Sequence, residues 1–211
     1  MLKGAGMSLI LALGALGIGI VIGVIMAAMK LSHSKILNVI ANLYVEILRG
    51  TPMLLQILFL FLGLPMIWRM VTGSRLEANP YIVGLIAMSL NSGAYQTELI
   101  RSGIQGVARG QWEACETLGI SYKTMMMKVI LPQAFKRIIP PMVSEFITLI
   151  KDSSLISTIG ATELLYSAQQ LGSRYFNYVG PLLIAGAMYL CMTICVSVIS
   201  RRIEKRFAIS D

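Results

Sequence analysis

The chain has 211 residues, of which 56% are hydrophobic and only 13% are charged, and its mean hydropathy is +0.74. Soluble domains usually carry about 25% charged residues, so this composition excludes an ordinary soluble domain and indicates a membrane protein. The net charge of +8 would suggest nucleic-acid binding in a soluble protein, but no basic stripe interleaved with aromatic residues is present. The length fits one transmembrane domain, residues 1–211, with five or six spans at about 20 residues per span.

The first half of the chain begins with a firm span and continues with an interrupted one. Met7–Met29 has no charged residue and is long enough to cross a bilayer. Residues 36–50 predict a helix that approaches along the membrane surface. Proline cannot continue a helix and displaces the residue before it from helical geometry, so we expect a break at Gly50-Thr51-Pro52 and a second span over Met53–Trp68.

The second half predicts three more spans. Tyr81–Arg101 is apolar at first and polar towards its end, and Tyr178–Ser200 is uncharged throughout. The intervening stretch, Ile138–Gly172, contains two prolines and several ionisable residues. One long broken span, or a span followed by a re-entrant piece, would fit it, because irregular backbone is tolerated at membrane depth only beside protein or a water-filled cavity.

Basic residues are distributed unevenly over the connectors of a five-span chain. Cytoplasmic loops are rich in Lys and Arg, so the richer side is predicted to be cytoplasmic, with the N-terminus outside and the C-terminus inside. The richer side holds Lys30, Lys35, Arg101, Arg109, Lys123, Lys128, Lys136, Arg137, Arg201, Arg202, Lys205 and Arg206, and the other side holds Lys3, Arg69, Arg75 and Arg174.

The connector Gly110–Ala134 has a pattern of its own on the predicted cytoplasmic side. Trp112, Cys115 and Leu118 recur with a spacing that places them on one apolar helical face. A turn is expected at Gly119, followed by a second helix that Leu131-Pro132 closes. An apolar face on a short cytoplasmic helix suits docking in the groove of a partner protein; a helix lying on the bilayer surface is the alternative.

Ordered motifs along the chain resemble the permease subunits of ABC importers, in particular the branch that carries polar amino acids. The resemblance covers roughly residues 8–206, and its centre is the EAA loop around Glu113-Ala114. The motifs are Tyr44-Val45-Glu46, Arg49-Gly50-Thr51-Pro52, Asn91-Ser92-Gly93-Ala94-Tyr95 with Glu98 and Arg101, Gly110-Gln111-Trp112-Glu113-Ala114, Gly119, Ile130-Leu131-Pro132-Gln133-Ala134, Lys151-Asp152-Ser153-Ser154-Leu155 and Glu163-Leu164.

The resemblance implies an all-α, polytopic membrane protein with about five spans and a cytoplasmic coupling helix, the fold of type I importer permeases. Two such permeases, identical or sister subunits, pair in the membrane. Two ATPase subunits bind ATP and Mg below them, and an external binding protein delivers the amino acid. The permease itself has no nucleotide site, no metal and no cofactor. Cys115 departs from the family, which usually has alanine there. The implied ATPase-coupling residues are Gly110, Trp112, Glu113, Ala114, Cys115, Leu118 and Gly119.

Ionisable residues inside spans are expensive and usually face an interior pathway. They are Glu98, Arg101, Glu145, Lys151, Asp152 and Glu163. Glu163 has no cation among its sequence neighbours, so it is a candidate to receive a substrate ammonium group, with a structural hydrogen bond to another span as the alternative. Asn91, Ser92 and Tyr95 are candidate polar companions, and interhelical hydrogen bonding is equally open for them. Glu98 is a further substrate candidate, although Arg101 stands three residues away and self-pairing is favoured.

Glu163 favours a basic substrate, namely arginine, lysine or histidine, with glutamine as the alternative. An ATPase-independent channel or secondary carrier is a more distant alternative, since a secondary carrier would normally be larger and show internal repeats. A membrane-embedded enzyme would need a metal cluster or a nucleophile with a base. His33 stands alone, and Cys191 and Cys195 have no partners of that kind.

Overall fold

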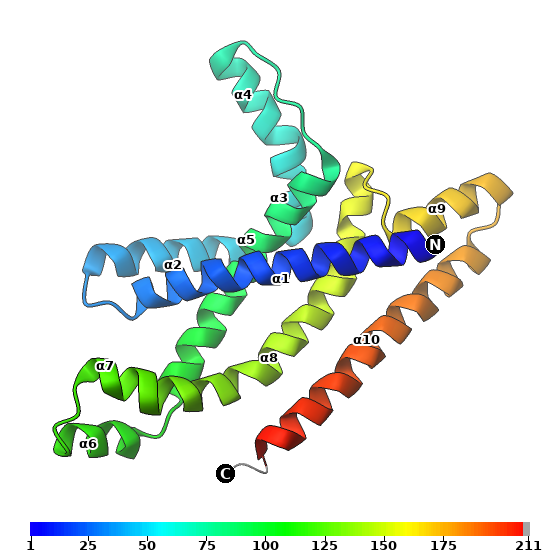
Figure 1. Ribbon diagram of the computed structural model, residues 1–211. Helices are drawn as coiled ribbons and strands as arrows, with labels where there is room; N and C mark the ends of the chain where they lie inside the picture. Colours follow the sequence, from blue (N-terminus) through cyan, green and yellow to red (C-terminus); the bar gives the residue numbers. More distant parts are fainter. Residues whose placement is uncertain (209–211) are drawn as a thin grey trace.

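A computed structural model describes residues 1–208 of the chain, with side chains described through Arg202. Helices and short connectors make up these 208 residues, with no strand among them (Figure 1). Lys205 and Arg206 of the predicted basic tail have side chains outside the described residues. The helices are α1 (Leu2–Lys30), α2 (Lys35–Gly50), α3 (Met53–Leu58), the π-helix η1 (Phe59–Gly63), α4 (Leu64–Thr72), α5 (Pro80–Gln105), α6 (Arg109–Thr117), α7 (Tyr122–Met125), the π-helix η2 (Met126–Ile130), α8 (Leu131–Asp152), the 3-10 helix η3 (Ser153–Ile159), α9 (Leu164–Tyr175) and α10 (Val179–Ala208).

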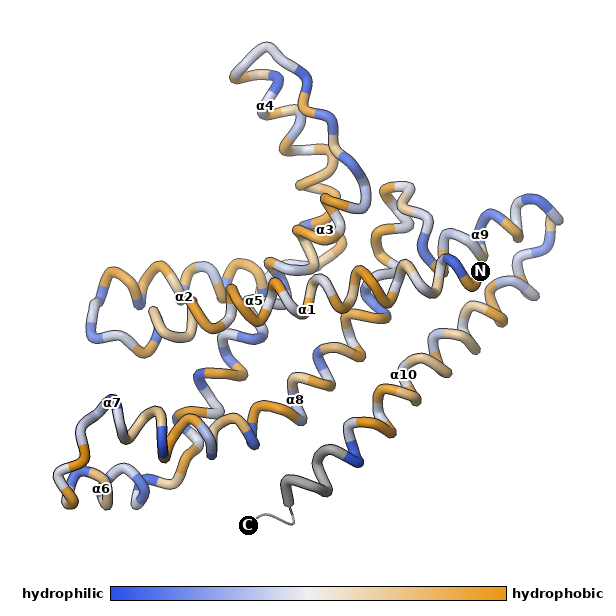
Figure 2. The backbone as a smooth tube through the Cα atoms, viewed as in Figure 1, coloured by the Kyte–Doolittle hydropathy of each residue, from blue (hydrophilic) through white to orange (hydrophobic). Residues whose placement is uncertain are grey.

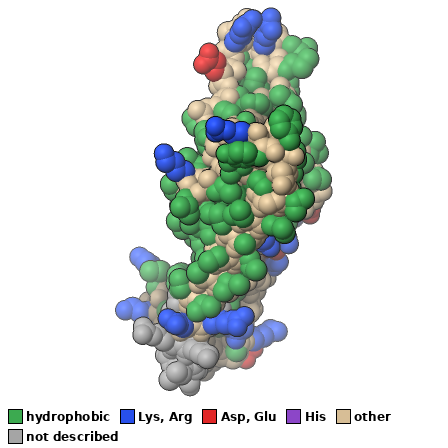
Figure 3. Space-filling view, turned by 90° about the vertical axis from the view of Figure 1, so that its right-hand side faces the viewer, with side chains coloured by type: hydrophobic (Ala, Val, Ile, Leu, Met, Phe, Trp, Pro, Cys, Tyr) green, Lys and Arg blue, Asp and Glu red, His purple; other side chains and the backbone are tan. Residues whose placement is uncertain are grey.

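Three helical stretches within the described residues are both long and apolar enough to cross a membrane. They are Leu2–Lys30, Met53–Thr72 and Val179–Arg202. Hydrophobic colour dominates α1 and α10, and hydrophilic residues gather in the connectors at the ends of the helices (Figure 2). The face in Figure 3 carries hydrophobic side chains over its middle, with Lys and Arg side chains at its upper end as well as towards its lower end. α5 and α8 match the length of a span but carry polar side chains.

α2 differs from its prediction. It turns back beside α1 and packs against both α1 and α5 (Figure 1), and the Tyr44 hydroxyl donates to the Leu90 carbonyl of α5 at 2.6 Å. A helix lying along the membrane surface would not reach the middle of α5, so that prediction is wrong. The physical reason is that one side of α2, with Ala41 and Val45, is apolar and small enough to be buried against the neighbouring helices.

The predicted break after α2 is confirmed, and side chains satisfy its backbone. Thr51 is extended, and Gln56 Nε2 donates to the carbonyls of Leu48 and Thr51 at 2.9 and 3.1 Å. The helix that follows runs on to Thr72, four residues beyond its predicted end. Pro65 lies within it, two residues after the end of η1, and the wider turn of a π-helix accommodates a residue that has no N–H to donate.

α8 corrects two expectations based on proline. The helix predicted to close at Leu131-Pro132 continues instead, because the π-helix η2 leads directly into α8 and its wider turn accommodates Pro132, which has no N–H to donate. Pro140 and Pro141 lie inside α8 without ending it. The predicted discontinuity in Ile138–Gly172 exists but begins after Asp152, where η3 ends at Gly160 with a φ of 85° and α9 starts a new direction.

α1 and α5 form the centre of the bundle and pack against each other over much of their lengths. Their backbones approach so closely that a Cβ on Gly23 would lie 2.5 Å from Cβ of Gln96. The main hydrophobic core joins these helices to α3, α8 and η3. A second core, around Ile104, Cys115 and Ile138, holds α6 and α7 to the ends of α5 and α8.

Candidate functional site

The segment α6–α7 lies at the end of the molecule that also holds the α1–α2 connector, and the N-terminus and α9 lie at the other end (Figure 1). α6 ends in a turn at Gly119, whose φ of 66° is left-handed and favours glycine. The backbone N–H of Ile120 donates to the Cys115 carbonyl at 3.0 Å, and the N–H of Gly119 donates to the Glu116 carbonyl at 3.0 Å. α6 is therefore a short, well-terminated helix presented at one end of the bundle.

The exposed face of α6 is not the one that the apolar spacing predicted. Cys115 is only 5% exposed and Trp112 packs beside it on the second core, whereas Leu118 is 75% exposed. The predicted docking face through Trp112, Cys115 and Leu118 is thus mostly turned inward, because α6 has its own apolar core to complete. Solvent meets Gly110, Glu113 and Ala114 instead, together with Leu118.

Glu98 of α5 is held by two cations rather than open to a ligand. Its carboxylate accepts from Lys30 Nζ at the end of α1 and from Arg101 Nη2 at 2.7 Å. The favoured alternative of pairing within α5 is therefore present, and Lys30 adds a partner that the sequence did not point to. These ion pairs fasten the end of α1 to α5, which gives Glu98 a structural position in this conformation.

Glu163 is fully enclosed, and its carboxylate has four partners. It accepts from the backbone N–H groups of Leu165 and Tyr166 at 2.8 and 2.7 Å, and so caps α9. Ser8 Oγ of α1 donates at 3.2 Å and the Tyr189 hydroxyl of α10 at 2.6 Å. Its exposed fraction is 0%. The expectation of an unpartnered carboxylate is wrong, and the alternative of hydrogen bonds to other spans is what the structure contains.

Asn91 and Tyr95 of α5 both face the end of α2. Asn91 is 8% exposed, and its Nδ2 donates to the Leu48 carbonyl at 3.0 Å and to Gln56 Oε1 at 3.1 Å. It thereby supports the break between α2 and α3. Tyr95 is 37% exposed, with the Arg49 guanidinium 5.0 Å from the centre of its ring. Asn91 is thus occupied by interhelical contacts, while Tyr95 and Arg49 stay open to the outside of the single chain.

Two polar side chains of α5 are fully buried, and the amide of the second has no hydrogen-bond partner among the described residues. They are Ser92 and Gln96, each fully buried against α1. The Glu145 carboxyl of α8 lies beside Ser92, with Arg49 and Asp152 within electrostatic range. Buried polar groups are usually hydrogen-bonded. The Glu145 carboxyl is the partner within reach of Ser92, whereas the Gln96 amide has none among the described residues.

The polar side of α8 is the feature that sequence reasoning undervalued. Five polar residues recur along one side of this helix, at spacings of three and four residues. Ser144, Thr148 and Lys151 are exposed in the single chain, and Glu145 and Asp152 are half-buried. The spacing was visible in the sequence, but the prolines and the charged pair suggested a disrupted helix rather than a continuous polar face.

The comparisons with known proteins agree on one family. Residues 19–209 match the family described as "Binding-protein-dependent transport system inner membrane component". The chain belongs to this family. It is a permease subunit of an ABC importer, a transporter component of the membrane, and the family resemblance drawn from its motifs is confirmed.

Named relatives of the family cover nearly the whole chain. An arginine transport system permease, ArtQ of Bacillus subtilis (strain 168), is 34% identical over 100% of this chain and 93% of its own. A protein of Rickettsia prowazekii (strain Madrid E) named as a glutamine transport system permease, GlnP, is 38% identical over 92% of this chain and 86% of its own. The L-cystine permease TcyB of Bacillus subtilis (strain 168) is 36% identical over 89% and 78%.

Solved structures support the fold at two levels. A crystal structure of an amino acid ABC transporter with histidines superposes with a TM-score of 0.90 at 36% identity, over 97% of this chain and 92% of the other. The methionine transporter MetNI in an inward-facing conformation reaches 0.73 at 16% identity, over 98% and 95%. At 16% identity, the likeness to MetNI shows a shared fold and nothing more.

Proposed function

We propose that this chain is the permease of an importer for basic amino acids, with arginine, lysine and histidine as substrates. The polar side of α8 carries this proposal, because it places two half-buried carboxylates, Glu145 and Asp152, beside exposed polar groups in a chain built for a membrane. Polar side chains cannot face lipid without a large cost. This side therefore faces a water-filled path or a second permease.

The groups around Glu145 complement a basic amino acid. The carboxylates of Glu145 and Asp152 suit an ammonium or guanidinium group, and Arg49 suits the substrate carboxylate. Ser92 and Tyr95, predicted as polar companions, lie at this level and stay in the proposed site. Glu98, Glu163 and Asn91 are engaged by protein partners in this conformation, so we assign them to holding the helices that form it.

Glutamine is the second candidate substrate. A relative named for glutamine is 38% identical over 92% of this chain, and the relative named for arginine is 34% identical over 100% of it, so similarity does not separate the two substrates. A neutral side chain would bring no cation to Glu145, whose charged neighbours are one carboxylate and one guanidinium, Asp152 and Arg49, and that is the physical reason for preferring a basic substrate.

The exposed face of α6 is the proposed contact with an ATPase subunit, which would bind ATP and Mg. Gly110, Glu113, Ala114 and Leu118 form this face, while Trp112, Cys115 and Gly119 hold the helix in shape. We propose that α6 is cytoplasmic, with the N-terminus outside and the C-terminus inside, because Lys and Arg are more frequent in the connectors on that side. Two permeases, identical or sister subunits, would enclose the path, with a binding protein on the outer side.

A panel of the twenty amino acids tests the substrate proposal. With the permease–ATPase complex in proteoliposomes and its binding protein added, we expect arginine, lysine or histidine to stimulate ATP hydrolysis and uptake. Stimulation by glutamine alone would replace the proposal with its second candidate. Glu113→Lys tests the coupling face: ATPase co-purification and uptake should both fall, while Glu77→Lys, an exposed change in a connector at another part of the chain, should leave both unchanged.

A further inference from the structure

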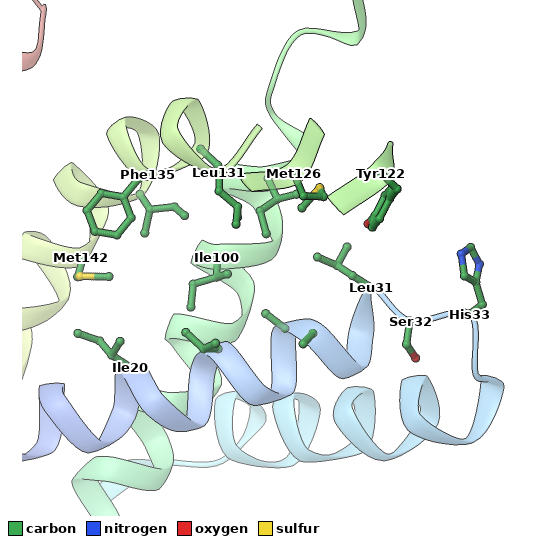
Figure 4. A pocket seen from close by; sticks show the side chains of 16 residues that line it. Ile20, Leu31, Ser32, His33, Ile100, Tyr122, Met126, Leu131, Phe135 and Met142 are labelled. Atoms are coloured by element: carbon green, nitrogen blue, oxygen red, sulfur yellow. The ribbon is translucent and has the colours of Figure 1, made fainter. Parts of the chain in front are cut away.

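A groove of about 820 Å³ lies between α1 and the first half of α8, with α5 as its floor and α7 at one end (Figure 4). Its volume lies within the roughly 300–1,000 Å³ of ordinary small-molecule sites. Ile20 and Val24 line it from α1, Ile100 from α5, and Phe135 and Met142 from α8. None of the contacts described above for coupling or for substrate uses this groove.

The groove is polar at one end only. Its polar lining side chains are Ser32, His33 and Tyr122, which lie together where the α1–α2 connector faces α7. The opposite end, towards Ile20 and Met142, is apolar (Figure 4). A molecule that fills it must therefore have a polar end and a long apolar body, the shape of a membrane lipid.

The surroundings of the polar end are positively charged. Lys35 follows His33 by two residues and Lys123 follows Tyr122, and both lysines are exposed. The segments 31–35 and 121–128 contain no Asp or Glu. Basic groups at the membrane surface attract anionic lipids, so the charge at this end complements a phosphate-bearing headgroup that carries a net negative charge.

The apolar rim of the groove indicates that it opens to lipid rather than to water. Val24 is 52% exposed and Phe135 is 61% exposed. At 3.6 residues per turn, Phe135 and Met142 lie on the opposite side of α8 from Ser144 and Thr148. The groove and the proposed substrate path thus use different sides of the same helix.

We propose that the groove binds an acyl chain of an anionic phospholipid, with its headgroup at Ser32, His33 and Tyr122 and near Lys35 and Lys123. The lipid fills the space between α1, α8 and the base of the α6–α7 segment. With α6 on the cytoplasmic side, the lipid belongs to the cytoplasmic leaflet.

Photochemical labelling of the assembled permease–ATPase complex in phosphatidylcholine nanodiscs tests the proposal. The probe is phosphatidylglycerol with a diazirine near the end of one chain. We expect labelled peptides from α1 and α8 that contain Ile20, Phe135 or Met142. Ala28 is an exposed groove residue, and Ala28→Trp should lower that labelling about tenfold by filling the space. Ala187→Trp, at an exposed alanine of α10 outside the groove, should leave it unchanged.

A second arm tests the headgroup. Lys35→Gln combined with Lys123→Gln should lower labelling by the phosphatidylglycerol probe about tenfold and leave a phosphatidylcholine probe unaffected. Thermal midpoint and ATPase co-purification verify assembly, and Val24→Trp replaces Ala28→Trp if the latter fails to assemble. Equal labelling in the groove-filling variants would overturn the proposal. So would a cross-link from a cysteine at position 24 or 135 to a second permease or to the ATPase, since protein would then cover the groove.

Discussion

Two carboxylates in the membrane-embedded part of this chain have opposite surroundings. Glu163 is sealed at the junction of α1, α9 and α10 and accepts four hydrogen bonds. Glu145 lies half-buried on the polar side of α8, next to the Ser92 hydroxyl and within electrostatic range of Arg49 and Asp152. The difference teaches that an ionisable residue in a span is evidence of a binding role only when its hydrogen-bond and ion-pair partners within the protein are known. Glu163 joins helices, whereas Glu145 is left with capacity for a ligand.

The two sites also differ in how closely their helices pack. At the Glu163 junction, a Cβ on Gly4 would lie 2.7 Å from the Glu163 carbonyl oxygen, so α1 and α9 meet at backbone distance. Beside Glu145, Ser144 and Thr148 remain exposed. The Glu163 junction is tightly packed, whereas the side of α8 around Glu145 is exposed in the single chain. The predicted changes below separate these roles by whether they alter stability or transport.

Glu163→Ala is expected to have the largest effect. It removes the cap of α9 and leaves the hydroxyls of Ser8 and Tyr189 without their acceptor, for a combined loss of about 3 kcal/mol. The thermal midpoint of the purified complex, and the amount recovered from membranes, should fall sharply. Glu77→Ala, at an exposed connector position, is the control. Normal stability together with lost uptake would instead return Glu163 to the substrate path.

Glu145→Gln is expected to reduce transport without unfolding the protein. Removal of a carboxylate that faces the substrate cation should lower kcat/KM for basic amino acids about tenfold, which corresponds to ~1.4 kcal/mol. Uptake of labelled arginine by proteoliposomes measures it, with the thermal midpoint recorded alongside. Glu77→Gln makes the same change at an exposed connector position and should have little effect. Unchanged arginine uptake in Glu145→Gln would exclude this carboxylate from the path.

Tyr189→Phe probes the strongest contact between α10 and the sealed carboxylate. It removes the 2.6 Å hydrogen bond but keeps the ring and leaves three donors on Glu163, so a loss of about 1 kcal/mol is expected. Denaturant titration of the complex in detergent measures it. Tyr178→Phe, at a half-exposed position near the start of α10, is the matched change. A loss as large as that of Glu163→Ala would mean that α10 alone governs the junction.

Ser8→Ala is expected to have the smallest effect. Its hydroxyl donates to Glu163 at 3.2 Å and accepts from the Leu164 N–H at 3.3 Å, both longer than the Tyr189 contact. Interhelical hydrogen bonds in membranes contribute about 0.6 kcal/mol on average, and a decrease of that size should appear in the same titration. A decrease greater than that of Tyr189→Phe would mean that the Ser8 hydrogen bond contributes more to stability than the Tyr189 hydrogen bond.

Much of the fold was predictable because it depends on local sequence. The uncharged runs mark α1 and α10, Gly50-Thr51-Pro52 marks the break before α3, and Gly119 marks the turn after α6. Prolines misled the prediction for α8, because a π-helix precedes Pro132 and the helix tolerates Pro140 and Pro141. The apolar face of α6 turns inward because it packs against α5 and α8 in the second core, and the sequence of α6 alone does not show this contact.

By itself, the sequence determined the class of protein and the family. Those properties depend on composition and on motifs of neighbouring residues, and both can be read from the sequence without knowledge of the fold. Only the tertiary structure decided which ionisable residues are occupied. The two side-chain partners of Glu163, Ser8 and Tyr189, lie 155 residues before it and 26 residues after it in the chain. Hydrogen bonds act over about 3 Å of space, and no local pattern reports which distant segments folding brings within that distance.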